Sequence, residues 1–241
     1  MKISYILRFI LIIFTLFFLG EIPEAVAKYE QARQRMVSDQ IRGRGISDRT
    51  VLAAMNAVQR HLFVPKKLLS QAYADHPLPI GEGQTISQPY IVALMTDSLG
   101  LTGDMNVLEI GTGSGYQAAV LSKIANRVYT IEIKKKLHTK ATQLLRSTGF
   151  INVETRHGDG YFGWEEAGPF DGIMITAAVD HVPPPLLKQL KNGGKLILPL
   201  GNPFSYQNLV LVTKKDDDYT VKQIIGVLFV PMTGHALERK K

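Results

Sequence analysis

A glycine-rich turn between an apolar run and a helix pattern is the segment whose residue types and spacing point most directly to a ligand. Residues 107–110 hold three apolar residues and one glutamate, and Gly111, Gly113 and Gly115 follow. Glycines allow a sharp turn and a close backbone approach to a ligand. Turns that bind nucleotide phosphates use the spacing G-x-G-x-x-G, and the chain has no Gly-Lys-Ser/Thr phosphate loop. The spacing therefore favours a ligand without phosphates, such as a nucleoside that carries an amino acid.

Two carboxylates follow the next two strand patterns. Glu132 ends the run 128–132, and a carboxylate there can accept hydrogen bonds from both hydroxyls of a ribose. Asp159 stands between Gly158 and Gly160 after the third strand pattern, where it could accept a hydrogen bond from an adenine amino group. Alone, each is equally compatible with an ordinary strand end or an Asp-Gly turn. Three such placements after three consecutive strands predict a site for S-adenosylmethionine at one edge of a sheet.

The segment from Pro79 to Pro89 is the best candidate for the acceptor side of this site. Its small and hydroxylated residues could fold over the cofactor, with Ser87 donating a hydrogen bond to an acceptor carboxylate, and its backbone could pair with an extended peptide. A carboxylate has a pKa of about 4 and is a competent nucleophile at neutral pH without a catalytic base. A single loop serine more often caps a turn, and the residues alone leave that alternative open.

Other acceptor classes have signatures that this chain lacks. Methylases of base amino groups carry an Asn/Asp-Pro-Pro-aromatic motif after the fourth strand, where residues 176–179 read Thr-Ala-Ala-Val. Residues 202–204 (Asn-Pro-Phe) look similar but follow the fifth strand pattern, and we interpret them as a turn. Methylation of a cytosine carbon requires a cysteine nucleophile, and the chain contains no cysteine.

The elements that must position these residues alternate between strand and helix patterns from residue 104 onward. Strands are predicted over residues 106–110, 127–131, 152–156, 172–176, 195–200, 209–213 and 221–230. Helices are predicted over residues 116–124, 137–148 and 185–190. We expect an α/β fold with a mostly parallel sheet, helices on both faces and an antiparallel edge formed by the last strands. A turn at Gly193-Gly194 should open the fifth strand, and residues 214–218 should form the last hairpin loop.

A helical and acceptor-loop part, residues 28–103, should precede this core (104–241). Within it, Ser47-Asp48 should cap a helix that buries one face, and residues 76–89 contain too many prolines and glycines for a regular element. A chain of 241 residues with 45% hydrophobic residues suits a single domain over residues 28–241.

The net charge of +7 could indicate a nucleic-acid or membrane partner, but the lysines and arginines are dispersed apart from short clusters at 134–136 and 239–241. We interpret them as a solvated basic surface and expect no nucleic-acid partner. The lack of cysteine excludes a disulfide framework and a cysteine-based zinc site, and we expect no metal. His157 and His181 fall near strand ends, but we interpret them as surface or loop residues because carboxylate chemistry needs no base.

Residues 1–27 form a pattern of their own. Lys2 and Arg8 precede the run 9–19, and small residues follow at 25–27. A basic start, a short apolar core and a small-residue exit are typical of a secretory signal peptide. The apolar run spans only about 17 Å as a helix, so we expect no stable membrane association after cleavage. An uncleaved anchor and an over-extended gene start, with initiation at Met36, are the alternatives.

The chain also resembles a known family along most of its length. Segments 62–65, 79–89, 109–116, 158–160 and 228–233 are similar, in this order, to protein-L-isoaspartate (D-aspartate) O-methyltransferases. The loop pattern Gly-x-Gly-x-Thr-Ile-Ser-x-Pro is the distinctive part. The family often has aspartate where this chain has a glutamate before the glycine-rich turn.

This resemblance implies a Rossmann-like class I S-adenosylmethionine methyltransferase with a mostly parallel seven-stranded sheet. It implies methyl esterification of the free carboxylate of L-isoaspartyl and D-aspartyl residues in damaged proteins, and the ester then collapses to a succinimide that allows partial return to aspartate. Ser87 would be the active-site residue, and Thr85, Ile86, Val230 and Pro231 would border the peptide. The residues expected to bind S-adenosylmethionine are Glu109, Gly111, Thr112, Gly113, Ser114, Gly115, Glu132, Gly158, Asp159, Gly160 and Thr233.

The partners implied are isoaspartyl-containing proteins and peptides, and we expect a monomer in the cytoplasm, where the cofactor is made. The signal-like residues 1–27 favour the periplasm or export instead. Two further readings stay open: a methyltransferase that acts on a small molecule or RNA, and an exported non-catalytic binding protein with the same fold. A nicotinamide dehydrogenase is disfavoured by the glycine spacing.

Overall fold

The structure of the protein is a computed structural model that describes residues 24–238. The chain divides into a first unit that ends at Ala32 and a second unit that begins at Arg33. The described residues of the first unit belong to helix α2 (Glu24–Arg35). Residues 1–23, which carry most of the signal-like pattern, lie outside the described residues. No helix within the described range combines the length and the apolar composition that crossing a membrane requires.

Short helices open the second unit. They are η1 (Met36–Ile41), η2 (Arg42–Arg44), α3 (Arg49–Ala57), η3 (Arg60–Phe63) and η4 (Lys66–Gln71). Asp48 caps α3, because its side chain accepts hydrogen bonds from the backbone N–H groups of Thr50 (2.8 Å) and Val51 (2.9 Å). These donors have no partner inside the helix, so the cap stabilises its first turn. The predicted cap and the helical character of this part are confirmed.

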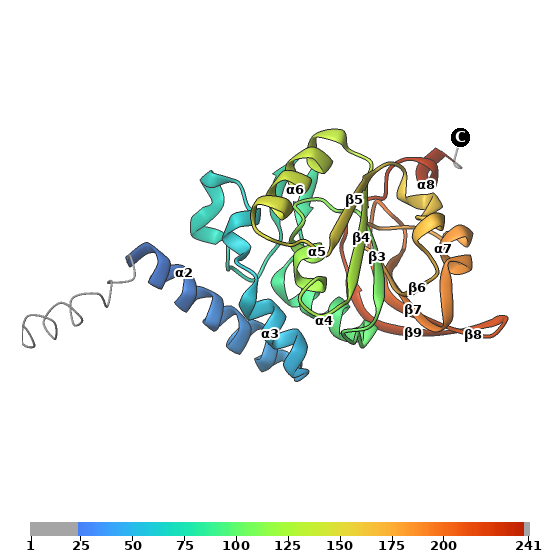
Figure 1. Cartoon of the computed structure of the whole chain (residues 1–241), viewed down its shortest axis with the longest axis horizontal. Helices are drawn as coiled ribbons and strands as arrows, with labels where there is room; N and C mark the ends of the chain where they lie inside the picture. The colour runs from blue at the N-terminus through green and yellow to red at the C-terminus, as the bar shows by residue number, and fades with distance from the viewer. Residues whose placement is uncertain (1–23, 239–241) are drawn as a thin grey trace, which may run out of the picture. The chain divides into compact units, whose positions relative to one another are not determined.

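Seven strands form one sheet in the order β5-β4-β3-β6-β7-β8-β9 (Figure 1). Their bounds are β3 (Asn106–Ile110), β4 (Arg127–Glu132), β5 (Val153–His157), β6 (Phe170–Ile175), β7 (Leu190–Gly201), β8 (Gln207–Lys215) and β9 (Asp218–Val227). Neighbouring strands from β5 to β7 are parallel, and β8 runs antiparallel to both β7 and β9. The predicted mostly parallel sheet of seven strands with antiparallel pairing at its C-terminal end is confirmed.

Helices cover both faces of this sheet (Figure 1). On one side lie α4 (Pro89–Leu99), α5 (Tyr116–Leu121) and α6 (Lys135–Ser147), and on the other lie α7 (Pro184–Lys188) and α8 (His235–Glu238). Successive side chains of a strand point to opposite faces. Leu108 and Ile110 therefore reach the core that contains Leu186 of α7, while Glu109 between them points to the other face.

A buried arginine joins the helical part to α5. Arg60 is fully buried, its Nε donates to the backbone carbonyl of Ala72 (2.9 Å), and its guanidinium lies 4.9 Å from the ring centroid of Tyr116. Burial lowers the pKa of Arg60 from 12.5 to about 10, which leaves the side chain charged at neutral pH. Since Tyr116 begins α5 directly after the glycine-rich turn, this contact supports the turn from behind.

A small antiparallel hairpin occupies part of residues 76–89, so the prediction that they form no regular element is wrong. β1 (Leu78–Gly81) pairs with β2 (Gln84–Ile86), and residues 81–83 all have positive φ (99°, 52° and 72°). The middle residue of these three is Glu82, and positive φ at a non-glycine residue is uncommon. From the sequence, the glycines are interpreted as signs of an irregular loop. In the structure they form a tight turn between two very short strands.

Two boundaries near the C-terminus also differ from the prediction. β7 begins at Leu190, which pairs with Phe170, and residues 191–194 form an irregularity inside the strand instead of a turn before it. β8 and β9 extend to a two-residue turn at Asp216-Asp217, so the last hairpin loop is shorter than predicted. β9 ends at Val227, and the residues after it leave the sheet.

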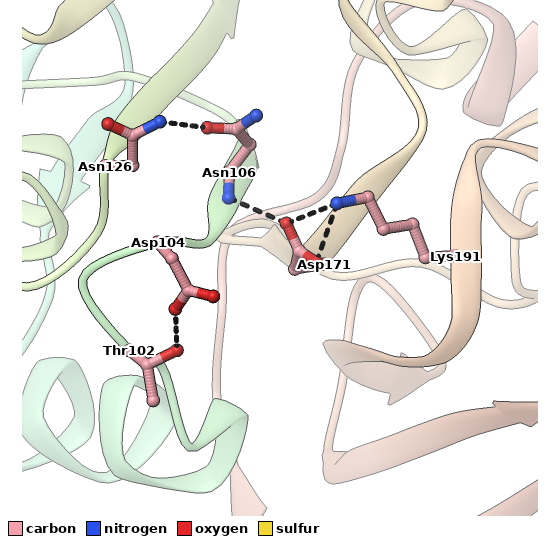
Figure 2. Close-up of polar contacts among 6 residues, drawn as sticks. All are labelled: Thr102, Asp104, Asn106, Asn126, Asp171 and Lys191. Carbon is pink, nitrogen blue, oxygen red and sulfur yellow. Dashed lines mark hydrogen bonds and ion pairs between the residues drawn. The ribbon is translucent and has the colours of Figure 1, made fainter.

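A polar network joins the amino ends of β3, β6 and β7 (Figure 2). Asp171 of β6 accepts a hydrogen bond from the backbone N–H of Asn106 (2.8 Å) and forms an ion pair with Lys191 Nζ (2.8 and 2.9 Å). Asn126, just before β4, donates to the side-chain oxygen of Asn106 (3.2 Å). With Asn126, the network links the amino ends of four neighbouring strands, β4, β3, β6 and β7.

Candidate active site

A cavity of about 780 Å³ opens at the carboxyl ends of the strands, the opposite edge from the polar network. It lies where the strand order reverses, since the chain runs from β3 outward to β5 and then returns to β6 on the other side of β3. Parallel α/β sheets bind their ligands at this point.

The glycine-rich turn forms one wall of the cavity. The Thr176 hydroxyl lies within hydrogen-bond distance of the backbone carbonyls of Ile110 (3.0 Å) and Gly111 (2.8 Å). Gly111 has a φ of 99°, and a Cβ at this position would lie 2.5 Å from Thr176 Oγ1. Only glycine therefore fits here, and both Gly111 and Gly113 line the cavity.

Glu132 ends β4 at the adjacent wall. Its side chain is 5% exposed, its Oε2 accepts from the backbone N–H of Gly113 (2.8 Å), and its Oε1 accepts from the backbone N–H of Lys134 (2.9 Å). These two donors fix the orientation of the carboxylate. Each carboxylate oxygen has a second lone pair, so the group can still accept hydrogen bonds from two vicinal hydroxyls.

The β1–β2 hairpin lies beside the glycine-rich turn and carries or directly precedes the residues predicted for the acceptor side. Thr85 and Ser87 line the cavity, and among the described residues the Ser87 hydroxyl has no hydrogen-bond partner. Ile80 packs against the turn, since its Cδ1 would lie 3.4 Å from a Cβ at Gly113. An ion pair between Glu82 and Lys136 (3.2 Å) connects the hairpin tip to α6.

The segment after β9 forms the remaining wall. Val230, Pro231 and Thr233 line the cavity. The backbone of Ala178 fixes this segment, because its N–H donates to the Val230 carbonyl (2.8 Å) and its carbonyl accepts from the Met232 N–H (2.9 Å). Residues far apart in the sequence thus enclose one space that has an anionic group on one side and a free hydroxyl on another.

Comparison with known proteins identifies the family of the chain. The family model described as "Protein-L-isoaspartate(D-aspartate) O-methyltransferase (PCMT)" matches residues 31–237. The chain belongs to this family. It is 71% identical over 211 residues to protein-L-isoaspartate O-methyltransferase 2 of Shewanella sediminis, a match that covers 88% of this chain and 86% of that protein.

Two further relatives agree. Protein-L-isoaspartate O-methyltransferase 1 of Nitrosospira multiformis is 58% identical over 216 residues, covering 88% of this chain and 92% of that protein. A crystal structure from Plasmodium falciparum, described as a protein-L-isoaspartate O-methyltransferase in complex with S-adenosyl-L-homocysteine, superposes with a TM-score of 0.72 at 26% identity. That superposition covers 83% of this chain and 98% of the other.

The structure brings together part of the set of residues predicted for a site of this family. The predicted residues that line the cavity are Thr85, Ser87, Gly111, Gly113, Glu132, Gly160, Val230, Pro231 and Thr233. The predicted residues that do not line it are Ile86, Glu109, Thr112, Ser114, Gly115, Gly158 and Asp159.

Glu109 and Thr112 lie behind the turn and not in the cavity lining. Glu109 is fully buried, and Thr130 donates a hydrogen bond to its Oε2. The Thr130 proton is used there, so the Thr112 hydroxyl donates to Thr130 (2.6 Å). Burial is the main cause that raises the pKa of Glu109 to about 8, and the charge of Glu132 adds to it. Glu109 is therefore mostly protonated at neutral pH and supports the turn as a neutral group.

Asp159 connects two backbone segments beside the cavity. Its Oδ1 accepts from the N–H of Tyr161 (3.0 Å) and its Oδ2 accepts from the N–H of His235 (2.8 Å). This joins the short helix η5 (Gly160–Phe162) to the start of α8. Gly160 therefore lines the cavity and Asp159 does not. The Asp159 carboxylate is held by these two backbone N–H groups, one of which comes from a distant part of the chain.

The other residues outside the lining have local structural contacts. Gly115 precedes α5 with a φ of 87° and packs against Leu145, and Ser114 Oγ accepts from the N–H of Tyr116 (3.2 Å). The Gly158 N–H donates to the Glu132 carbonyl (3.1 Å), and Ile86 is 3% exposed in the core. These contacts shape the wall from behind.

Several cavity residues were missed by the sequence reasoning. Thr176 and Ala177 follow β6 directly, so their position after the fourth core strand was a usable signal. The turn predicted at residues 202–204 is confirmed, since Asn202 Oδ1 accepts from the Phe204 N–H (2.9 Å). Pro203 and Phe204 nevertheless also line the cavity, and no local pattern indicated this.

The two histidines near strand ends, His157 and His181, do not line the cavity. His157 Nε2 lies 3.1 Å from the Ile133 carbonyl, and His181 contacts Asp180 (2.6 Å) and the Tyr161 hydroxyl (3.2 Å). Within residues 24–238, no histidine lines the cavity and no cluster of three metal-binding side chains occurs. The polar residues of the lining thus include one carboxylate and several hydroxyl groups, together with Gln84, Gln88 and Lys134.

Proposed function

We propose that this protein transfers a methyl group from S-adenosylmethionine to the free carboxylate of L-isoaspartyl and D-aspartyl residues in damaged proteins, and so starts their repair. The family match over residues 31–237 supports the reaction and the cofactor. The observation that carries the assignment of the site is that one cavity joins the glycine-rich turn, Glu132 and the free hydroxyl of Ser87.

The cavity residues suit the cofactor. Gly111 and Gly113 leave backbone exposed where a side chain would fill the space, and Glu132 presents a carboxylate that two backbone N–H groups already orient. We assign the nucleoside ribose to Glu132 and the amino-acid end to the turn at Gly111–Gly113. A volume of about 780 Å³ is in the range of pockets that bind ligands of this size and leaves room for an acceptor. When bound, the cofactor supplies an electrophilic methyl group.

Ser87 is the residue assigned to the acceptor. Its hydroxyl can donate a hydrogen bond to one oxygen of the incoming carboxylate and so orient the other oxygen for attack. The acceptor carboxylate is ionised at neutral pH, so no protein group has to remove a proton. Thr85, Val230 and Pro231, which line the same cavity, would contact the peptide around the modified residue.

Methyl transfer to a matched pair of peptides tests this function. An isoaspartyl peptide should accept labelled methyl groups from S-adenosylmethionine, and the same peptide with a normal aspartyl residue should not. Equal transfer to both peptides would reject the substrate assignment and favour a methyltransferase with another acceptor. Titration calorimetry with S-adenosylhomocysteine distinguishes the proposed enzyme from the non-catalytic alternative. The enzyme should bind this compound, and a protein that keeps only the fold should not.

The compartment and the partners belong to the same proposal. We place the enzyme in the cytoplasm as a monomer without a nucleic-acid partner, since the cofactor is made there, and we keep the periplasm as the alternative because residues 1–27 have a signal-like pattern. N-terminal sequencing of the mature protein after cell fractionation tests this directly. A periplasmic protein that begins near residue 28 would overturn the cytoplasmic assignment.

A further inference from the structure

Exposed apolar side chains gather at the edge of the cavity. Phe204 and Leu228 are 73% and 77% exposed, and both line it. Tyr206, which is 64% exposed, lies against Gly226, another lining residue, because a Cβ there would lie 1.3 Å from the Tyr206 hydroxyl. We call Phe204, Tyr206 and Leu228 the apolar rim. Clustered apolar side chains at the edge of a binding site commonly mark a surface that another molecule covers.

A buried glutamine fixes both segments that carry the apolar rim. Gln207 is fully buried, and its Nε2 donates to the backbone carbonyls of Asn202 (2.8 Å) and Ser205 (2.6 Å). Its Oε1 accepts from the N–H of Phe229 (2.8 Å). One side chain thus anchors the turn between β7 and β8 and the segment after β9. The apolar side chains are therefore presented by a fixed backbone, which lowers the entropy lost when a partner covers them.

The substrate itself must pass over this surface. The acceptor is a carboxylate within a polypeptide, and each neighbouring residue lies only about 3.5 Å further along an extended chain. A peptide whose isoaspartyl carboxylate reaches Ser87 consequently lays its neighbouring residues across the edge of the cavity. The side chains of the apolar rim carry no charged group, so they favour apolar neighbours over polar ones.

Resting on the proposed function, we infer that the apolar rim is a specificity subsite that binds an apolar side chain next to the isoaspartyl residue. Bound there, such a side chain buries its own surface together with that of Phe204 and Leu228. A polar side chain of the same size gains less from this burial and loses contact with water. The enzyme therefore selects damaged sites in apolar sequence contexts, which are the sites that unfolding exposes.

Matched isoaspartyl peptides test the subsite. One peptide carries leucine on both sides of the isoaspartyl residue, and the other carries glutamine, which is similar in size and uncharged. The natural enzyme should show a kcat/KM about tenfold higher for the leucine peptide, the ratio expected if roughly half of one leucine side chain is buried. The double variant Phe204→Ser/Leu228→Ser should reduce this ratio to about twofold or less.

The ratio is measured within one enzyme preparation, so a loss of active protein does not change it. Ile151→Ser is the matched control, because Ile151 is 94% exposed in the turn before β5, away from the cavity, and this variant should keep the tenfold ratio. Activity on both peptides with an equal kcat/KM, or a ratio that survives in the double variant, would overturn the subsite. Failure of every isoaspartyl peptide to accept a methyl group would instead reject the proposed function.

Discussion

Buried or half-buried carboxylates occur at both edges of the parallel sheet, and their partners differ. At the amino edge, Asp171 receives one backbone N–H and an ammonium group, so its charge is paired with that of Lys191 (Figure 2). At the carboxyl edge, Glu132 receives two backbone N–H groups, and within the described residues it forms no ion pair. Glu132 lines the cavity and Asp171 does not.

On the proposed function, this difference separates a group that stabilises the fold from a group that would bind the cofactor. A carboxylate paired with a lysine has its strongest interaction already satisfied, so it adds to the stability of the strands that it joins. A carboxylate that is oriented by backbone donors but lacks a cation keeps accepting capacity for a ligand. The comparison predicts that substitutions at the two positions have opposite consequences for binding and for stability.

The largest expected effect follows Glu132→Ala. We expect the binding of S-adenosylhomocysteine to weaken by about 1–3 kcal/mol, because the ribose hydroxyls lose their acceptors in a partly dehydrated site. Titration calorimetry on this variant and on Asp171→Ala measures the difference. If the two variants bound S-adenosylhomocysteine with equal affinity, the assignment of the ribose to Glu132 would be rejected.

Ser87→Ala should reduce turnover by about one to two orders of magnitude, since a single oriented hydrogen bond to the acceptor is lost. Ser87 lies on the acceptor side, so the affinity for S-adenosylhomocysteine should stay close to that of the natural protein. Single-turnover methylation of an isoaspartyl peptide, combined with calorimetry, separates the two quantities. A weaker cofactor affinity with unchanged turnover would assign Ser87 to the cofactor instead.

Asp171→Ala should lower the free energy of unfolding by about 1–2 kcal/mol, because the Asn106 N–H and the Lys191 ammonium lose a shared acceptor at the joint of three strands. Urea unfolding monitored by circular dichroism measures this loss. The KM for S-adenosylmethionine of the folded variant should not change. A raised KM with unchanged stability would show that the network acts on the site.

Much of the fold was accessible to sequence reasoning because its signals are local. The alternation of strand and helix patterns located β3, β4 and β5 to within one or two residues. The rule that parallel strands end at one edge correctly placed Gly111 and Glu132 beside the same cavity. These predictions depend on residues close in sequence. They needed only the period of the pattern and the residue at each strand end.

The remainder depended on contacts between distant segments. One partner of the Asp159 carboxylate is the N–H of His235, 76 positions away, and no spacing rule could have indicated that contact. The apolar rim likewise arises because Gln207 joins its own turn to Phe229. The β1–β2 hairpin was missed because its turn uses a positive φ at Glu82, which residue type does not reveal.

Glu109 is a third carboxyl with a different environment, because within residues 24–238 it has neither a lysine nor a backbone donor and accepts only from the Thr130 hydroxyl. Its pKa is raised from 4.5 to about 8, so between these values the folded protein holds a proton that the unfolded chain releases. Its contribution to stability is therefore full below about pH 4.5 and falls as the pH rises toward 8, by about 1 kcal/mol per pH unit.

Glutamine stays neutral throughout, so Glu109→Gln should remove this dependence of stability on pH. Urea unfolding of both proteins at pH 5, 6, 7 and 8 measures the difference, since the two proteins differ in this one titratable group. A difference that does not vary with pH would mean that Glu109 is charged in the folded protein and that the turn rests on an ionised group.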